Sequence, residues 1–417
     1  MAKSKKTVYC SLDIEGTGLD SRKDNIIEVG AVLFEIDDKG GLILGKEFSQ
    51  LVKPEIPIPE FIQNLTGIRE KDVADAPTWQ EVLPGFKKFV GKHVILGQNI
   101  QFDLSFLAAA GLKFEQDSMD TKQLAGMFLP HAKFFNLEYL MRFVGEPLVS
   151  HHRALDDAKT TAKLLQKIIQ SFHSLPFQLQ TQVAELLEGS KAVYKELFKA
   201  SKTISDSPVA PAPSVAVSGE SYQATLFENE KKSVATTLPG KISECLSKAV
   251  TFDAAFIDIG LVPPGSDLAA FIAGKVANLA GGAVFAFESL ENGLAELSGD
   301  WLVVEDPRNS ICEVRLEELL ARGKPSILLA EFLVKVLVWK EVTGGHSIRN
   351  LSLFGDDYNF RDLVCADFGA CSKHAPQSAC HVGKTIAEWK SGSKVLTTHA
   401  ALLAFCQANP GQKFAST

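Results

Sequence analysis

Two acidic residues stand close together near the start of the chain, in Asp13-Ile14-Glu15-Gly16-Thr17-Gly18. The apolar run before them predicts a buried strand. Because side chains alternate along a strand, the carboxylates of Asp13 and Glu15 point to the same side. They repel each other there unless a cation offsets the repulsion. The alternative is a solvated strand end that leads into a Gly-Thr-Gly turn, and these residues alone do not decide between the two.

Two further acids fall where predicted helices begin. Asp103 opens the helix that follows the apolar strand Val94–Gly97, and Asp157 opens a helix expected from about Ala154 to Phe172. Either acid alone could be a helix cap or dipole partner. In α/β folds, however, strand ends and helix starts form the active site. Four carboxylates there would suit two divalent metals about 4 Å apart, which clamp the attacking and leaving oxygens of a phosphodiester.

A histidine precedes the last of these acids. His152 lies five residues before Asp157, so it can approach the same place. An imidazole there could deprotonate a water molecule near neutral pH. A lone histidine would be interpreted as a surface loop residue, but the four acids favour a catalytic role for His152.

The elements around these residues indicate an α/β sheet covered by helices. Strand-like runs, helical stripes and turn residues alternate as such a fold requires. Residues 7–172 resemble the DEDDh exonucleases of the DnaQ type, the group of the proofreading epsilon subunits. The resemblance is carried by Asp13-Ile14-Glu15-Gly16-Thr17-Gly18-Leu19, Leu65-Thr66-Gly67-Ile68, Gly97-Gln98-Asn99-Ile100-Gln101-Phe102-Asp103, Asp120-Thr121 and His152-Arg153-Ala154-Leu155-Asp156-Asp157-Ala158. It implies an RNase H-like fold with a mixed five-stranded sheet and flanking helices.

The resemblance also implies an activity, which is metal-dependent 3′–5′ hydrolysis of single-stranded or frayed DNA ends in replication or repair. Four carboxylates would bind two Mg²⁺ or Mn²⁺ ions, with His152 as general base. These are Asp13, Glu15, Asp103 and Asp157. Three other residues, Thr17, Leu19 and Asn99, would touch the 3′-terminal nucleotides. Gln98 stands where the family commonly has a histidine, at a position that is not a ligand.

Composition bounds the rest of the chain. At 417 residues it is too long for one ordinary core. We expect the exonuclease domain in residues 1–172, a helical extension in 173–202, a flexible linker in 203–240 and a further region in 241–417. No apolar run is long enough to span a membrane, and the basic start lacks a signal-peptide core, so we expect a cytoplasmic bacterial protein. The net charge of −7 leaves nucleic-acid contact to local patches.

The linker contains the peptide Gln223-Ala224-Thr225-Leu226-Phe227. Leucine and phenylalanine in a polar linker are costly unless a partner buries them. The peptide resembles the short Gln-x-x-Leu-Phe sequences that dock on the bacterial sliding clamp, through Gln223, Leu226 and Phe227. Chance or local packing is the alternative.

The last region again alternates strands and helices, which predicts a second α/β unit. Its loop 260–267 has the glycine spacing of a phosphate-binding loop, but Ser266 and Asp267 replace the residues that contact phosphate and magnesium. We therefore expect no ATP binding. Residues 383–385, Gly-Lys-Thr, have no preceding strand and do not supply the missing motif.

Four cysteines in this region could ligate a 4Fe-4S cluster, namely Cys312, Cys365, Cys371 and Cys380. The segment resembles helicases of the DinG and XPD type in a degenerate, truncated form. A zinc site that includes His374 or His381, or plain buried thiols, are the alternatives.

Two other functions compete with a DNA exonuclease. One is a ribonuclease of the same fold that trims RNA or oligonucleotides. The other is a non-catalytic adaptor that holds clamp and DNA. The complete acid set argues against the adaptor.

Overall fold

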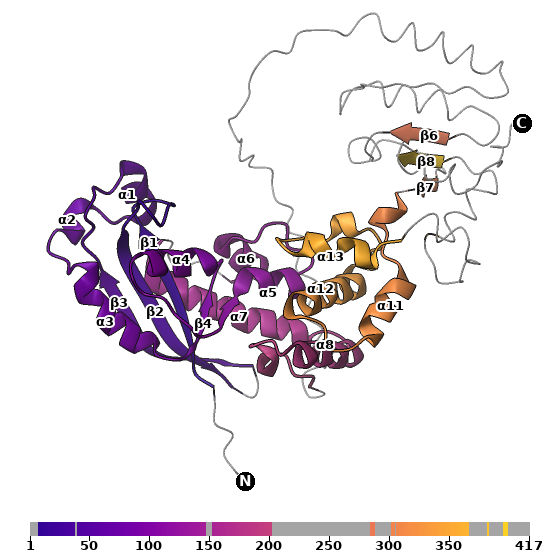
Figure 1. Cartoon of the computed structure of the whole chain (residues 1–417), viewed down its shortest axis with the longest axis horizontal. Helices are drawn as coiled ribbons and strands as arrows, with labels where there is room; N and C mark the ends of the chain where they lie inside the picture. The colour runs from indigo at the N-terminus through magenta and orange to yellow at the C-terminus, as the bar shows by residue number, and fades with distance from the viewer. Residues whose placement is uncertain are drawn as a thin grey trace, which may run out of the picture. The chain divides into compact units, whose positions relative to one another are not determined.

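A computed structural model describes residues 7–37, 40–146, 152–201, 306–366 and 382, together with three short strands at 284–287, 302–304 and 395–398 (Figure 1). The clamp-like peptide, the loop 260–267, Cys371 and Cys380 lie outside the described residues. The chain divides into two compact units. Unit 1 consists of residues 1–215, 322–345 and 350–360, and unit 2 contains the remainder.

Unit 1 is built on a five-stranded sheet in the order β3-β2-β1-β4-β5. β1 pairs antiparallel with β2, and β2 pairs antiparallel with β3, whereas β1, β4 and β5 run parallel. The predicted mixed sheet of an RNase H-like fold is thereby confirmed. The strands are β1 (Tyr9–Gly16), β2 (Ile26–Ile36), β3 (Leu42–Leu51), β4 (Val94–Gly97) and β5 (Ser118–Asp120).

Helices follow the strands, and their ends carry the expected signals. α3 begins after Thr78, which forms a capping box with Glu81, and ends at Gly91 with φ 57°. α1 ends at Gly67 in the left-handed conformation that glycine favours. The helices of this part are α1 (Glu60–Thr66), α2 (Glu70–Val73), α3 (Trp79–Val90), α4 (Gln101–Ala109), α5 (Thr121–Phe128), α6 (Leu137–Phe143), α7 (Ala154–His173), α8 (Phe177–Ser190) and the short 3₁₀ helix η1 (Lys195–Leu197).

The two faces of β1 have different neighbours. Cys10, Leu12 and Ile14 belong to a buried apolar cluster that also contains Phe86 of α3 and Phe106 of α4. The alternate residues, which include Asp13 and Glu15, point to the opposite face, where α7 packs on β1 and β2. The strand period therefore directs the carboxylates away from the main core and towards the start of α7.

A segment from the far end of the chain completes unit 1. α12 (Ile327–Thr343) packs on α5 and α8. Its residues are buried around most of its circumference, so it needs partners on more than one side. This grouping differs from the expected single region 241–417, because residues 322–345 and 350–360 belong with the exonuclease fold. The docked segments are far from α5 and α8 in the sequence, so local sequence patterns did not predict this contact.

Polar pairs are buried around α12. Lys335, 1% exposed, forms an ion pair with Asp357, and its ammonium lies 4.3 Å from the centre of the Phe354 ring. Tyr194 donates a hydrogen bond to Glu331 of α12. Phe354 in turn packs against Phe135 with ring centres 4.7 Å apart. The docked segment is thus joined to the exonuclease fold by an apolar ring contact and by the hydrogen bond from Tyr194, whereas the Lys335–Asp357 pair lies within the segment.

The described part of unit 2 includes a parallel three-stranded sheet in the order β6-β8-β7. Its strands are β6 (Val284–Phe287), β7 (Leu302–Val304) and β8 (Val395–Thr398). The helix expected after Cys312 is α11 (Glu313–Ala321). The remaining elements are the 3₁₀ helix η3 (Pro307–Asn309), and two elements that the division between the units crosses, namely η4 (Ile348–Asn350) and α13 (Asp357–Val364). This sheet agrees with an α/β unit and does not identify a helicase.

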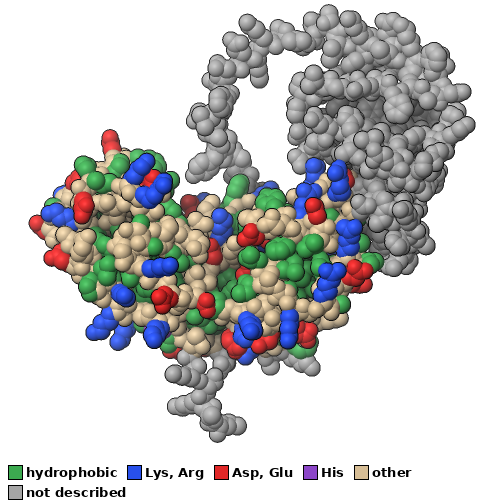
Figure 2. Space-filling model, in the orientation of Figure 1, with side chains coloured by type: hydrophobic (Ala, Val, Ile, Leu, Met, Phe, Trp, Pro, Cys, Tyr) green, Lys and Arg blue, Asp and Glu red, His purple; other side chains and the backbone are tan. Residues whose placement is uncertain are grey.

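Two surface properties bear on function. Among the described residues, no helix has the length and apolar character needed to cross a membrane. On the face drawn in Figure 2, basic and acidic side chains of the described residues are interspersed. This distribution agrees with the expectation that any nucleic-acid contact depends on local patches.

The buried ion pair on α12 generates a stability prediction. Lys335→Met leaves Asp357 buried without its cation, so we expect a loss of about 3–5 kcal/mol in the free energy of unfolding. Thermal and urea unfolding of the full chain measure it. Lys88→Met, at an exposed lysine of α3, is the control and should change stability by no more than about 0.5 kcal/mol. Equal effects of the two changes would contradict the buried docking of α12.

Candidate active site

Three carboxylates meet where β1 ends and α7 begins. Asp13, Glu15 and Asp157 each offer an oxygen, and these oxygens lie within 4.8 Å of one another. Carboxylate oxygens are hard ligands of the kind that Mg²⁺ and Mn²⁺ prefer. The donor set therefore fits a divalent metal ion, and the structure brings together three of the four acids predicted from the sequence.

The fourth acid approaches from α4. Asp103 is 3% exposed, and its Oδ1 accepts a hydrogen bond of 3.1 Å from the backbone N–H of Ile14, between the two acids of β1. This bond fixes Asp103 against the strand that carries Asp13 and Glu15. Asp103 also raises the pKa of Asp13 through its charge, so all four acids share one electrostatic environment.

Burial and mutual repulsion disfavour ionisation of this cluster. Burial, then the charges of Asp103, Glu15 and Asp157, raise the pKa of Asp13 well above its usual range. Burial and neighbouring carboxylates raise the pKa of Glu15 to about 8, opposed by the charge of Arg153. Burial raises the pKa of Asp103 to about 8 as well. A folded chain that keeps such a cluster is arranged for a bound cation.

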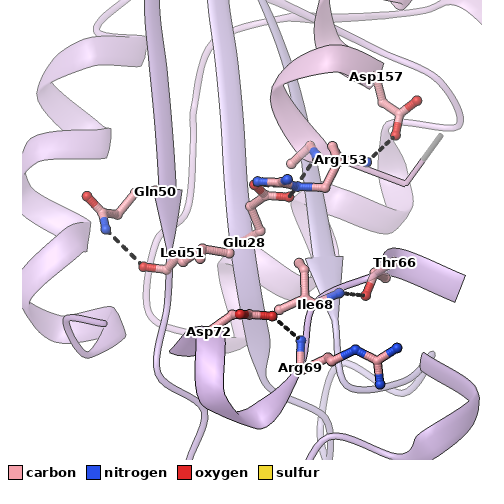
Figure 3. Close-up of polar contacts among 10 residues, drawn as sticks. Glu28, Gln50, Leu51, Thr66, Ile68, Arg69, Asp72, Arg153 and Asp157 are labelled. Carbon is pink, nitrogen blue, oxygen red and sulfur yellow. Dashed lines mark hydrogen bonds and ion pairs between the residues drawn. The ribbon is translucent and has the colours of Figure 1, made fainter. Parts of the chain in front are cut away.

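His152 stands next to the start of α7. It is partly buried, and its φ of 60° is unusual for a residue with a side chain. The next residue donates its backbone N–H to the carboxylate of Asp157 at 3.1 Å, as Figure 3 shows at Arg153. His152 thus lies directly before the N-cap residue of α7, and that N-cap residue is hydrogen-bonded to the metal-ligand candidate Asp157. Strained backbone of this kind is typical of functional sites.

The three predicted nucleotide contacts have different surroundings. Leu19 is 83% exposed, so its apolar side chain is available to a ligand. Asn99 is exposed with φ 58°, and its N–H donates to Asp120. The side chain of Thr17 is instead buried, because its hydroxyl donates to Asp24 and accepts from the N–H of Asn25. Thr17 therefore shapes the loop after β1 with its side chain.

Sequence reasoning assigned no role to Glu28 and Gly30 on β2. Glu28 is 1% exposed and pairs with Arg153 (Figure 3). A Cβ at Gly30 would lie 2.1 Å from the backbone of Leu155, so only glycine allows this approach of α7 to the sheet. An acid inside the apolar run Ile26–Ile36 was a signal that a partner must exist. The sequence did not identify that partner.

Two of the four candidate cluster cysteines are described. Ile311 and Cys365 form an antiparallel bridge, and Cys312 donates its N–H to the carbonyl of Val364. Cys312 and Cys365 therefore lie on neighbouring stretches of chain, although the other two cysteines are outside the described residues. Burial raises the pKa of the Cys365 thiol to about 11. The described residues do not distinguish among an iron–sulfur cluster, a zinc site and plain thiols.

Comparison with known proteins identifies the family. The family model described as Exonuclease matches residues 10–165. DNA polymerase III subunit epsilon of Aquifex aeolicus is 37% identical over 167 residues, which are 39% of this chain and 80% of that protein. DNA polymerase III PolC-type of Caldanaerobacter subterraneus is 36% identical over 193 residues, 45% of this chain and 13% of that protein. Among solved structures, exonuclease X in complex with 5′ overhanging duplex DNA is 27% identical, covering 39% of this chain and 92% of that one, with a TM-score of 0.32.

The fold and the acid cluster define an exonuclease domain of the DnaQ-like type in about the first 165 residues. The chain belongs to the exonuclease family that includes the epsilon subunit of DNA polymerase III. It spans only about an eighth of the length of the PolC-type relative. The relatives and the solved structure named here do not show the resemblance to helicases that the sequence suggested.

The raised pKa values generate a prediction for pH. Between the ordinary carboxyl pKa of about 4 and the folded values of about 8 for Glu15 and Asp103, the folded metal-free chain binds more protons than the unfolded chain. The free energy of unfolding therefore falls as pH rises through this range. Excess Mg²⁺ at pH 8 should restore it, because the cation offsets the repulsion. Thermal unfolding at pH 5 and pH 8, in chelator and in Mg²⁺, measures both effects.

Asp13→Asn is the matched control for this pH effect. It removes an acid whose ionised form the buried cluster disfavours, so the free energy of unfolding of the metal-free variant should exceed that of the metal-free wild type at pH 8 by about 1 kcal/mol or more. The variant should also gain less from Mg²⁺. A variant that is less stable than wild type in chelator at pH 8, or an unchanged response to Mg²⁺, would contradict the assignment of repulsion to this cluster.

Proposed function

We propose that this protein is a metal-dependent 3′–5′ exodeoxyribonuclease that acts in DNA replication or repair. The observation that carries the proposal is the meeting of Asp13, Glu15 and Asp157 within 4.8 Å, with Asp103 fixed beside them. Four buried or partly buried carboxylates at one strand end are costly without cations. Two divalent ions, when bound, would stabilise the charge that develops on the scissile phosphate.

Residues of the chain would bind the metal ions, accept a proton and contact the substrate. Asp13, Glu15, Asp103 and Asp157 would hold Mg²⁺ or Mn²⁺, and His152 would accept a proton from the attacking water. Leu19, exposed in the loop after β1, would contact the terminal base, since an apolar side chain can pack on the face of any base. Asn99 would contact the same 3′ end, and Thr17 would contribute through the loop that it shapes.

The choice of DNA over RNA rests on the relatives. Those matched here are named as subunits or types of DNA polymerase III. We therefore propose single-stranded or frayed DNA 3′ ends as substrate, and a bacterial cytoplasmic location, where such DNA lies. A ribonuclease of the same fold is the competing assignment, because the carboxylate cluster itself does not read the 2′-hydroxyl.

Catalysis provides the direct test. Asp157→Ala removes a metal ligand and should abolish most of the Mg²⁺-dependent release of nucleotides from a 3′-labelled DNA strand. His152→Ala should lower kcat by roughly 10²- to 10⁴-fold, the usual size of a general-base contribution. Asp156→Ala, at the exposed neighbouring acid, is the control and should keep wild-type activity.

Four results would contradict parts of this assignment. Release in excess chelator at the wild-type rate would exclude the metal-dependent reaction. His152→Ala within about twofold of wild type would exclude His152 as the base. Faster degradation of a matched RNA strand than of the DNA would favour the ribonuclease, and no release from either strand would favour the adaptor.

We further propose that the linker binds a bacterial sliding clamp through Gln223, Leu226 and Phe227. Support comes from the sequence of the peptide and from its position beside an exonuclease. Two apolar anchors are few, so we expect a Kd on the order of micromolar. Replacing Leu226 and Phe227 by Ala should abolish clamp binding, measured by surface plasmon resonance, and preserve activity on short substrates. Equal binding by both proteins would reject the proposal.

For residues 241–417 we propose a degenerate helicase-like remnant that does not use ATP. Its support is the sequence of residues 241–417, in which Ser266 and Asp267 spoil the phosphate loop. A 4Fe-4S cluster on Cys312, Cys365, Cys371 and Cys380 is the associated proposal, supported by the adjacency of the first two cysteines. Iron and zinc content after purification without oxygen is the measurement that bears on it.

A further inference from the structure

Glu28 occupies an unfavourable position that requires an explanation. It lies opposite Glu15 in the β1–β2 register, and its side chain is 1% exposed. A buried carboxylate that faces another carboxylate is repelled and poorly solvated. Its charge also raises the pKa of Asp13 and Glu15. Glu28 therefore adds to the repulsion in the cluster, although three of the metal-ligand candidates already meet without it.

Groups at the start of α7 donate hydrogen bonds to the carboxylate of Glu28. Arg153 donates from Nε to both carboxylate oxygens at 3.2 Å and from Nη2 to one of them at 2.8 Å. The backbone N–H of Ala154, in the first turn of α7, donates to the other oxygen at 3.0 Å. The forked, charge-assisted pair fixes direction as well as distance. Figure 3 shows the guanidinium and the carboxylate facing each other between β2 and the start of α7.

Two further contacts make this the point where α7 is positioned. Gly30, two residues along the same face of β2, allows the backbone of Ala154 and Leu155 to rest on the strand. Arg153 also donates its backbone N–H to Asp157 at 3.1 Å. Arg153 therefore connects to β2 through its side chain and to a metal-ligand candidate through its backbone. It also directly follows His152.

We propose that Glu28 and Arg153 are positioning residues that set the place of His152 and Asp157 relative to Asp13 and Glu15. This inference rests on the proposed exonuclease function. Neither residue is among the candidate metal ligands or the proposed base, and the contacts described above join the two residues to each other and to the first turn of α7. It fixes the first turn of α7 over β2, so that the strand pair and the helix present their functional groups to one point. Positioning groups of this kind affect catalysis or metal binding by about 10- to 100-fold.

A merely structural role is the alternative, in which the pair only holds α7 on the sheet. The chain supplies a matched comparison. Lys159 of α7 forms an ion pair of 2.8 Å with Glu47 of β3, so it also joins this helix to this sheet. Both side chains of that pair are partly exposed, and neither belongs to the acid cluster. A structural role predicts similar consequences for the two pairs.

The experiment uses the full chain and the double variant Glu28→Gln/Arg153→Met. Removal of both charges avoids an orphaned buried carboxylate, so the variant should fold with a Tm near that of wild type. We expect kcat on single-stranded DNA to fall about 10- to 100-fold, with KM changed by less than threefold. Arg153→Lys, which keeps the charge without the fork, should recover part of kcat. Lys159→Met/Glu47→Gln should keep wild-type kcat.

A second readout does not use the reaction. Calorimetric titration of the metal-free proteins with Mn²⁺ should show weaker binding in the Glu28→Gln/Arg153→Met variant if Asp157 is displaced. Unchanged Mn²⁺ binding with reduced kcat would assign the effect to His152, which also supports the proposal. The proposal is overturned if kcat of the double variant stays within threefold of wild type, or if the Lys159/Glu47 variant loses as much activity.

The remaining outcomes are separable. If the Glu28→Gln/Arg153→Met variant does not fold, Arg153→Lys decides, because an unchanged kcat in that folded variant excludes the need for a forked contact. If wild-type protein releases no nucleotides, the exonuclease assignment fails. In that case an unchanged Mn²⁺ affinity in the double variant overturns the positioning of Asp157 independently, whereas a weakened affinity supports it.

Discussion

The repulsion among carboxylates at the end of β1 is the constraint on which the rest of the exonuclease domain depends. Burial and like charges raise the pKa of Asp13, Glu15 and Asp103, so the fold must hold these groups against their electrostatic preference. It does so with rigid elements. A strand supplies two acids, α4 supplies a third through a hydrogen bond to Ile14, and α7 supplies the fourth. The metal-free cluster therefore lowers the stability of the fold, and a bound cation relieves the repulsion.

The positive charge of Arg153 limits this cost. Its charge opposes the rise in the pKa of Glu15, and its guanidinium forms an ion pair with the buried carboxylate of Glu28. A single guanidinium at the N-terminus of α7 thus interacts favourably with the carboxylates of both Glu15 and Glu28. The arrangement also explains why a glycine stands at position 30, since any side chain there would push the helix away from the strand. The contact between the start of α7 and β2 therefore determines both the electrostatics of the cluster and the packing of the helix.

The sequence predicted the parts of the site whose signals are local. Alternation on β1 placed Asp13 and Glu15 on one face, and the starts of α4 and α7 located Asp103 and Asp157. The family resemblance implied a fifth strand, but local pattern did not locate β5, because three residues carry too little periodicity. The Glu28–Arg153 pair spans 125 positions, and no local pattern connects its members. The burial of Thr17 likewise depends on a tertiary loop contact with Asp24 and Asn25.

The docking of α12 has a consequence for synthesis on the ribosome. Residues 1–201 leave the ribosome before α12 exists, because α12 begins at Ile327. At roughly 5–20 residues per second, the faces of α5 and α8 wait on the order of ten seconds for the helix that covers them. During that interval the buried hydroxyl of Tyr194 lacks the carboxylate of Glu331. The nascent exonuclease domain therefore exposes the faces of α5 and α8 that α12 covers until residues 327–343 have been synthesised.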